Sequence, residues 1–352
     1  MLPEQEGTQI DFVTLGMFII DDIYPPPTAA DQTPKTDIIG GAGTYSAIGA
    51  RLFSPPPHQS KSIGWIVDKG TDFPPDLLDL IASWQTGALI RPRDALTTRG
   101  WNGYGENEHR AFKYLTEKKR LTADDLTPEL LASRSFHLIC SPLRCVQMVE
   151  RIHVRRQEAF GGGLGDPVII WEPVPDLCTP GELPNTFQAL KHVDVVSPNH
   201  EELGSLFGYK HGSGVDREAV EEQAAELCQA FPAERTSGVV VVRCGAVGCY
   251  VLPKPSYGAA DKPAGTWLPA YHRNASRVID PTGGGNGFLG GLAVGLVRHN
   301  GDVVEAARWG SIAASFCIEQ VGVPEITSRD TSDERWNDES VHERLESLKG
   351  RS

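Results

Sequence analysis

The sequence has little of what marks membrane or nucleic-acid-binding proteins. It contains no run of about 18 consecutive apolar residues, so no segment is long enough for a transmembrane helix. Positive charge is scarce, because 33 Lys and Arg residues face 46 Asp and Glu residues and leave a net charge of −13. Such a chain would not release phosphate counterions at scale, so we expect neither a nucleic-acid nor a membrane partner.

Paired cysteines are also missing. The seven cysteines include no CxxC pair and have no histidine neighbour at zinc-ligand spacing. We therefore expect buried free thiols in a reducing compartment. The N-terminal stretch MLPEQEGTQIDFVTLGMFIID has acids ahead of its apolar residues, with neither a basic start nor a small-residue cleavage pattern. The expected location is cytoplasmic.

Two nucleotide-binding motifs are absent as well. No GxxxxGK[ST] occurs in the chain, which excludes a P-loop kinase. A dinucleotide oxidoreductase needs GxGxxG after its first strand, whereas Gly16 is followed by Met17, Phe18 and Ile19. That class of enzyme is set aside.

What the sequence does contain is an alternation of strand and helix patterns. Short apolar runs rich in β-branched residues predict buried parallel strands at 12–20, 62–67, 136–139, 168–171, 193–197 and 239–243. Helical patterns lie between several of them, at 44–53, 143–160, 201–207 and 217–231. This order predicts an α/β fold with a doubly wound, three-layer arrangement.

The ends of that fold and two interruptions can also be placed. We expect one domain over residues 10–325, followed by a charged C-terminal tail at 326–352 that either docks or frays. Residues 24–39 and 97–115 break the alternation with prolines and turn glycines. We predict that these two segments form a small β lid.

The most informative segment is RVIDPTGGGNGFLGGLAVGLVRHN at 277–300. A strand-like start meets three glycines and then an apolar pattern with helical spacing. The start of a helix presents unpaired N–H groups and the positive end of its dipole, and glycines let a phosphate approach that backbone. The segment thus predicts an anion hole, the alternative being a tight turn with glycines for packing.

DPTGGGNGFLGG resembles the C-terminal signature of the PfkB carbohydrate kinase family, D-T-x-G-A-G-D-x-F-x-G-G. The resemblance implies a ribokinase-like fold in which Gly283, Gly284 and Gly285 bind the transferring phosphate. The residue that follows them would take the proton of the substrate hydroxyl, and here it is Asn286. An amide cannot act as a general base. If the chain is a kinase that has lost its base, Asn286→Asp should raise phosphoryl transfer, whereas in a protein that only binds a nucleotide the change should do little.

Further landmarks resemble the substrate side of the same family. GMFIID at 16–21 places Asp21 where the family holds substrate hydroxyls, although an Asp at a strand end is also a common turn former. GGAGTYSAIGA resembles the N-terminal signature, which implies that Gly40 and Gly41 approach the substrate. Tyr45 stands where an Asn is usual. The alternative for this stretch is a glycine-capped helix entry.

The nucleotide side is matched by two motifs. SPNHEELGSLF resembles N-x-x-E, which implies that Asn199 and Glu202 lie near Mg²⁺ and phosphate, with water between. The same spacing is a reciprocal capping pattern, and both interpretations can hold. VVVVRCGAVGCYV resembles the hairpin T-x-G-x-x-G, keeping Gly245 and Gly248 and placing Arg243 at the Thr position. Arg243 reaches phosphate or is an ordinary strand-end charge.

The resemblance carries three further implications. Asp280 and Thr282 are candidates for a site that holds a monovalent cation, K⁺, although Asp280 is otherwise a plain turn residue. The GGGN turn, the 97–115 segment and the C-terminal residues are similar to a fungal subgroup of the family. A homodimer through the lid is a further expectation.

Two functions follow from these features. The first is ATP-dependent phosphorylation of a hydroxyl on a small sugar-like or nucleoside substrate, with catalysis impaired by Asn286. Such transfer depends mostly on positioning, so losing a base need not abolish it. The second is a pseudokinase that binds a nucleotide or metabolite and acts through a protein partner.

Overall fold

The computed structural model describes residues 9–25, 32–104, 110–209, 214–233, 237–255, 265–330 and 333–351. Parts of both predicted lid segments, 26–31 and 105–109, lie outside this range. The helices are α1 (Ala42–Arg51), α2 (Pro75–Ser83), α3 (Pro128–Leu131), α4 (Pro142–Phe160), α5 (Leu183–Ala189), α6 (His200–Leu206), α7 (Arg217–Gln229), α8 (Gly284–Arg298), α9 (Val303–Cys317) and α10 (Val341–Lys349).

Within the described residues, nine strands form the main sheet in the order β13-β12-β11-β10-β9-β8-β1-β4-β5. From β11 to β5 all neighbours are parallel, and β12 and β13 add antiparallel to one edge. The strands are β1 (Phe12–Thr14), β4 (Ile63–Lys69), β5 (Gly87–Pro92), β8 (Ser135–Cys140), β9 (Val168–Pro173), β10 (Val195–Val196), β11 (Val239–Arg243), β12 (Cys249–Pro253) and β13 (Thr266–Leu268).

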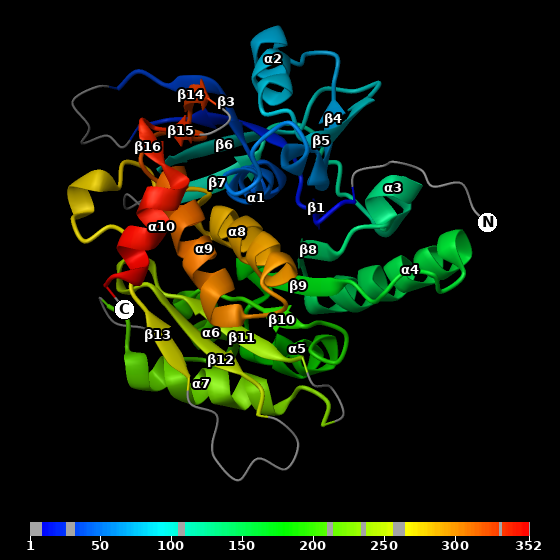
Figure 1. The fold of residues 1–352 in the computed structure, drawn as a ribbon, viewed down its shortest axis with the longest axis vertical. Coiled ribbons are helices and arrows are strands. Elements are labelled where there is room, and N and C mark those ends of the chain that lie inside the picture. The colour runs from blue at the N-terminus through cyan, green and yellow to red at the C-terminus, as the bar shows by residue number, and fades with distance from the viewer. Residues whose placement is uncertain are drawn as a thin grey trace.

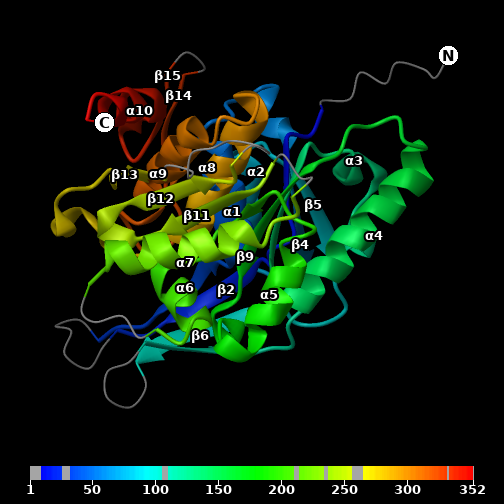
Figure 2. The ribbon, with the colours of Figure 1, turned by 90° about the horizontal axis from the view of Figure 1, so that it is seen from below.

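Helices cover both faces of this sheet, as Figures 1 and 2 show. One apolar cluster joins a sheet face to α1, α2, α8 and α9, and includes Ile81, Leu292 and Ile312. The second joins the opposite face to α3, α4, α5, α6 and α7, with Met148 and Leu227 among its members. The predicted three-layer α/β architecture is confirmed.

The small β lid is a separate four-stranded sheet in the order β3-β2-β6-β7. Its strands are β2 (Ile19–Ile23), β3 (Lys35–Gly40), β6 (Arg99–Tyr104) and β7 (Arg110–Tyr114). The predicted strand at 12–20 is therefore wrong as a single element. Its first part, β1, lies in the main sheet, whereas its last residues open β2 of the lid.

The segment before the glycine turn also differs from the prediction of a strand. A 3₁₀ turn occupies Ala275–Arg277, and the next residues lie outside any strand. The reason is their hydrogen bonding, because the N–H groups of Ile279 and Asp280 both donate to the carbonyl of Ile318, at 2.8 and 3.2 Å. The turn is thus tied to the end of α9 rather than to the sheet.

The C-terminal residues fold onto the α8 and α9 layer. They form a hairpin of β14 (Ile326–Asp330), β15 (Asp333–Trp336) and β16 (Glu339–Ser340), followed by α10. Trp336 is fully buried, and Leu345 and Leu348 join the same apolar cluster as α9. In Figure 1 this red segment lies against the orange α9.

The expectation of buried free thiols is confirmed, because all seven cysteines are buried and unpaired. In the parts of the chain that the structure describes, every helix is too short or too polar to span a bilayer.

Candidate functional site

Parallel strands end at one edge of the sheet, and polar residues collect there. Thr14 closes β1, His137 lies in β8, Glu172 precedes the last residue of β9, and Arg243 closes β11. In open α/β sheets, ligands bind beyond the carboxyl ends of the strands. We therefore take this edge, together with the start of α8 above it, as the candidate site.

The start of α8 has no side-chain cap. Its N-cap is Gly283, with φ 78°, a left-handed conformation that favours glycine. A Cβ on Gly283 would lie 2.2 Å from the ring of Tyr45, so this glycine also makes room for that ring. By contrast, α4, α7 and α9 begin at side chains that accept from their first N–H groups. The first turn of α8 thus has N–H groups that no side chain caps.

Helix α1 brings the substrate-side signature to the same place. It also begins at an uncapped glycine, Gly41, with φ 87°. Tyr45 from this helix contacts Gly283, and one turn later Gly49 packs against the backbone of Gly287 in α8. The two predicted signatures, which are far apart in sequence, are therefore joined by close packing of α1 on α8.

The guanidinium of Arg243 lies against the first turn of α8. Its Nη1 would be 2.0 Å from a Cβ on Gly285. Its Nη2 lies 2.9 Å from Glu172 Oε1, 3.3 Å from Glu202 Oε2 and 3.0 Å from the carbonyl oxygen of Ser197. Among the residues that the structure describes, Nη1 and the buried Nε have no hydrogen-bond partner. Arg243 thus links Glu172, Glu202 and Ser197 beside the start of α8.

Glu172 is buried and surrounded by donors. Its Oε2 accepts from Asn286 Nδ2 at 2.7 Å and lies 3.2 Å from His137 Nε2. Burial alone would raise the pKa of Glu172, but the charge of Arg243, aided by His137 and Asn286, brings it below the ordinary value. The carboxylate is therefore ionised at neutral pH. We call Glu172, Glu202, Arg243, His137 and Asn286 the phosphate-side network.

His137 connects this network to β1 and α1. Its Nδ1 lies 3.0 Å from Thr14 Oγ1 and 3.1 Å from Ser46 Oγ, and the ring is fully buried. Neither His137 nor Glu172 was among the predicted site residues. A signal was present, since both are polar residues in otherwise apolar strands and lie on the face that α8 covers.

Asn199 and Glu202 form the reciprocal capping box at the start of α6. Asn199 Oδ1 accepts from the Glu202 N–H at 2.8 Å, and Glu202 Oε2 accepts from the Asn199 N–H at 2.7 Å. Burial raises the pKa of Glu202 to about 6, with Arg243 opposing and Glu172 reinforcing that rise. Arg243 links this pair to the glycine turn of α8, because its guanidinium contacts Glu202 on one side and Gly285 on the other.

These residues fit Mg²⁺ only through water. Among the described residues, Glu202 Oε1 has no hydrogen-bond partner and can accept from a metal-bound water, whereas the other oxygens of the pair already accept from backbone N–H groups. In the described parts of the chain, no three His, Cys, Asp or Glu side chains are grouped as metal ligands. An ion held by protein side chains alone does not fit at this place.

The other predicted residues lie around this centre. Asp21 is buried in the lid, where it accepts from Asn102 Nδ2 at 2.9 Å, and a Cβ on Gly40 would collide with its carboxylate. Gly245 and Gly248 form the turn between β11 and β12, both with positive φ.

The candidate cation-site residues form a turn of their own. Asp280 Oδ1 accepts from the N–H of Thr282 at 3.0 Å and from its hydroxyl at 2.6 Å. These hydrogen bonds agree with the alternative interpretation, in which Asp280 is a turn residue.

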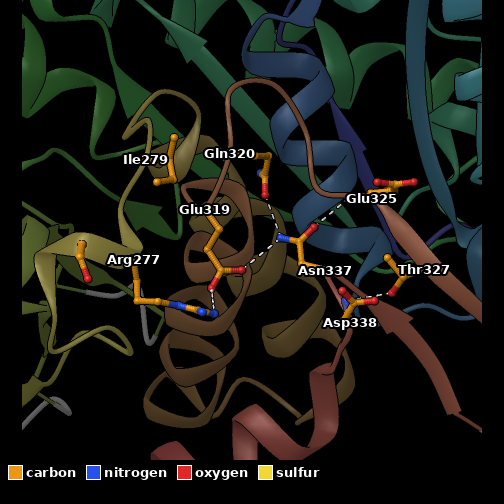
Figure 3. A pocket seen from close by; sticks show the side chains of 9 residues that line it. Arg277, Ile279, Glu319, Gln320, Glu325, Thr327, Asn337 and Asp338 are labelled. Carbon is orange, nitrogen blue, oxygen red and sulfur yellow. Dashed lines mark hydrogen bonds and ion pairs between the residues drawn. The ribbon is translucent and has the colours of Figure 1, made fainter. Parts of the chain in front are cut away.

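A second buried network lies beside this turn, at the junction with the C-terminal hairpin. Glu319 binds Arg344 at 2.9 Å, Arg277 at 2.9 Å and Asn337 at 3.1 Å, and lies 3.3 Å from His272. A cavity of about 390 Å³ adjoins it, and Figure 3 shows Glu319, Asn337 and Arg277 along its wall. We call Glu319, Arg344, Arg277, His272 and Asn337 the C-terminal network.

Comparison with solved structures shows which known folds are similar to this one. It is similar to a ribokinase from Giardia lamblia with a TM-score of 0.68 and 18% identity, covering 98% of this chain and 100% of that one. It is also similar to a ribokinase from Cryptococcus neoformans var. grubii serotype A, solved in complex with ADP, with a TM-score of 0.64 and 17% identity, covering 98% and 100%.

Comparison with curated sequences gives relatives over the whole chain. An uncharacterized protein of Schizosaccharomyces pombe is 36% identical and covers 96% of this chain and 92% of its own length. Protein MAK32 of Saccharomyces cerevisiae is 34% identical, covering 98% and 94%. Residues 173–329, which include the glycine turn, Asn199 and Arg243, match the pfkB carbohydrate kinase family. With its ribokinase-like fold and its glycine turn at the start of α8, this chain belongs to the PfkB family of carbohydrate kinases.

Proposed function

We propose that the chain binds ATP with the terminal phosphate at the first turn of α8, and transfers that phosphate to a hydroxyl of a small sugar-like or nucleoside substrate. The observation that carries the proposal is the position of Arg243, whose guanidinium lies against Gly285. A cation and an uncapped helix start thus meet at one point, where a phosphate is stabilised by both. The ADP bound to a ribokinase of similar fold supports a nucleotide as the ligand.

Arg243 has a hydrogen-bond donor that the protein itself does not use and that is available for this role. Its Nη2 is held by Glu172, Glu202 and Ser197, which fixes the guanidinium in place. Its Nη1 has no partner among the described residues, so it can donate to a phosphoryl oxygen, whereas the buried Nε is out of a ligand's reach in this conformation. Arginine presents such donors in a fixed plane that matches phosphate geometry.

The substrate would lie between the lid and α1. Asp21 offers a carboxylate in the middle of β2, and Gly40 leaves space for it. Tyr45 connects this side to the phosphate turn through its contact with Gly283. A carboxylate acceptor suits a ligand that is rich in hydroxyl groups.

Magnesium would be held through water by Glu202, at the edge of the phosphate-side network. When bound, the ion supplies neutralisation of the charge on the transferring phosphate. A K⁺ ion beside Asp280 and Thr282 is a further part of the proposal, supported by the position of this turn directly before the glycines.

Catalysis would proceed without a dedicated base. The bond from the acceptor oxygen to phosphorus forms as the bond to ADP breaks, and the hydroxyl proton passes to a phosphoryl oxygen. A general base supplies roughly 10²–10⁴-fold, so transfer remains feasible but slow. Asn286 can orient the hydroxyl, since its amide oxygen accepts a hydrogen bond.

A second function, a nucleotide- or metabolite-binding pseudokinase that acts through a protein partner, is favoured by the pairing of Asn286. Its amide is bound to Glu172, and Glu172 in turn is bound to Arg243. The polar groups at the turn are therefore held by one another as well as being available to a ligand. Binding without turnover is the behaviour expected of such a site.

Nucleotide titrations of the full chain separate these functions. Thermal shift with ATP or ADP, each with and without Mg²⁺, measures binding, because a ligand of the native state raises its stability. ADP formation is then followed with pentoses, hexoses, polyols and nucleosides. Acceptor-dependent ADP formation supports the kinase, and binding with no acceptor-dependent turnover supports the pseudokinase. Absence of nucleotide binding at millimolar concentration contradicts the proposal.

A pair of glycine variants makes this test specific. Gly285→Ala places a methyl group 2.0 Å from the present position of Arg243 Nη1, so the guanidinium must move. We expect MgATP affinity to fall at least roughly tenfold, the equivalent of about 1.4 kcal/mol. Gly165→Ala is the matched control, since nothing lies within 4 Å of its added Cβ. Equal affinities in the two variants would contradict the phosphate site.

The lid offers a surface for a second copy of the chain. Phe112, Tyr114 and Leu115 are exposed on β7 or directly after it, and Phe112 packs edge-on against Tyr114. Burial of these side chains would stabilise a homodimer through the lid. Sedimentation of the full chain tests this, and a monomer at all concentrations contradicts it.

A further inference from the structure

The pair of Asn286 and Glu172 fixes which atom of the amide is available to a ligand. Asn286 Nδ2 donates to Glu172 Oε2 at 2.7 Å. An ionised carboxylate can only accept, so the NH₂ group must face Glu172 and Oδ1 must point elsewhere. Asn286 is half-buried, and its Oδ1 has no hydrogen-bond partner among the residues described by the structure. The amide oxygen is therefore the free end.

We infer that Glu172 is a positioning residue, and that Glu172 and Asn286 are a matched pair in which the carboxylate stands on β9 and the amide at the start of α8. This inference rests on the proposed function for its consequence in catalysis. The amide oxygen, held outward by Glu172, accepts a hydrogen bond from the substrate hydroxyl and aligns it with the phosphate at Gly285.

Glu172 acts through Asn286 rather than on the substrate, because both of its oxygens are already engaged. Oε1 binds Arg243 at 2.9 Å, and Oε2 binds both His137 and Asn286. The side chain is only 6% exposed. A base must reach the proton that it removes. Glu172 therefore does not replace the missing base.

The pair changes what Asn286→Asp is expected to do. The new carboxylate would stand within hydrogen-bond distance of Glu172 Oε2, where the amide now donates. Two carboxylates at such a separation cannot both ionise, so one of them binds a proton. The single substitution therefore does not install a base at neutral pH. Combining it with Glu172→Gln reverses the pair, since the new glutamine amide can donate to the new aspartate.

The test compares the full-length wild type with E172Q, N286D and the double variant E172Q/N286D. The unfolding midpoint Tm is measured at about pH 8 and about pH 5, together with MgATP affinity by calorimetry. We expect N286D alone to lower Tm by about 5 °C at the higher pH, and by less at the lower pH, where the extra carboxyl is protonated. The double variant should regain most of the lost Tm at both pH values.

ADP formation from MgATP is measured with the acceptor that gives the highest wild-type rate, or with water when none does. The double variant should exceed the wild type by part of the roughly 10²–10⁴-fold that a general base supplies, whereas N286D alone should not exceed it. E150Q, which removes an exposed carboxylate on α4, is the control for a change in net charge and should match the wild type.

The outcomes separate the two proposals. If no variant binds MgATP, the proposed function fails, while the Tm values still decide the pairing. If N286D alone keeps the wild-type Tm at both pH values, or if the losses in the two single variants simply add in the double variant, the matched pair is refuted. Turnover in N286D above that of the wild type and equal to that of the double variant would also refute it.

Discussion

The phosphate-side network and the C-terminal network are built from the same kinds of residue, yet their bonding differs. Each network holds a buried glutamate, Glu172 or Glu319, between an arginine and a histidine. In the C-terminal network, all three nitrogens of Arg344 are bonded, to Glu339, Ser315 and Glu319. In the phosphate-side network, two of the three nitrogens of Arg243 have no partner among the described residues.

The pKa values of Glu319 and Glu202 differ in the same sense, whereas the pKa of Glu172, like that of Glu319, lies below its ordinary value. Burial would raise the pKa of Glu319, but bonds from His272, Arg344 and Asn337 lower it to about 2. Burial raises the pKa of Glu202 to about 6 despite Arg243. A fully satisfied network stabilises one conformation, whereas a partly satisfied one retains donors for a ligand. We infer that the C-terminal network serves the fold and the phosphate-side network serves binding.

The largest effect is expected when the C-terminal network is broken by Arg344→Met. Arg344 is 2% exposed, and its guanidinium also lies 3.7 Å from the ring centroid of Phe316. Removing it leaves Glu319 buried with fewer partners, which costs about 3–5 kcal/mol. The measurement is unfolding by urea.

Arg335→Met provides the control for that substitution. Arg335 lies 3.8 Å from Glu343 in an exposed ion pair, so its loss should cost less than about 1 kcal/mol. If both substitutions cost equally little, Arg344 does not hold the fold together.

Matched lysine substitutions sharpen the comparison between the two arginines. Arg243→Lys keeps a charge beside Glu172 but loses the planar donors that we assign to phosphate, so MgATP affinity should fall by roughly tenfold with little loss of stability. Arg344→Lys cannot keep the separate bonds that the three guanidinium nitrogens make to Glu339, Ser315 and Glu319, so stability should fall by about 1–3 kcal/mol while MgATP affinity is retained. Calorimetry measures MgATP affinity and urea unfolding measures stability. If Arg243→Lys lowered stability and Arg344→Lys lowered MgATP affinity, the roles assigned to the two networks would be reversed.

Much of the fold could be predicted because it depends on local patterns. The glycine turn and the helix Gly284–Arg298 can be predicted from the sequence, since the helical spacing of apolar residues and the glycines reflect local geometry. The strand predicted at 12–20 was wrong because a continuous apolar run does not reveal where a chain leaves one sheet for another. That change depends on strand partners elsewhere, such as β6 of the lid.

The site was predictable only where a motif names its residues. Asn286 and Arg243 were identified, but their connection through Glu172 was not, because residue 172 is more than 60 positions from either and no local pattern links them. His137 was missed for the same reason. Both were detectable only as polar residues in apolar strands, a signal that gains meaning once the order of the strands is known.

A pH series should separate Glu202 from Glu319 by the sign of the response. The pKa of Glu202 lies above its ordinary value, so its stabilising contribution is complete below about pH 4.5 and is lost as the pH rises through about 6. Glu202→Gln removes this loss, and its stability relative to wild type should rise by about 2 kcal/mol across that range.

Glu319 should behave in the opposite way. Its pKa lies below the ordinary value, so its contribution is present above about pH 4.5 and is lost as the pH falls toward 2. Glu319→Gln should therefore be less stable than wild type at neutral pH, with the gap closing in acid. Urea unfolding between about pH 3 and 8 gives both profiles. Two profiles of the same sign would remove the distinction between Glu202 and Glu319.

The smallest effect concerns two helix caps, one beside each network. Asn199 caps α6 and Ser340 caps α10, each accepting from an N–H three residues later, at 2.8 and 3.4 Å. Asn199→Ala and Ser340→Ala should each lower stability by about 1 kcal/mol, as the loss of a capping bond does.

If Asn199 only caps α6, the two variants should not differ in any other property. If it also orders water around Mg²⁺, Asn199→Ala alone should weaken the dependence of ATP affinity on Mg²⁺, because its side chain lies beside Glu202 and the Ser340 side chain does not. ATP titrations at a series of Mg²⁺ concentrations decide between these outcomes, and an unchanged Mg²⁺ dependence in Asn199→Ala would leave capping as the role of this residue.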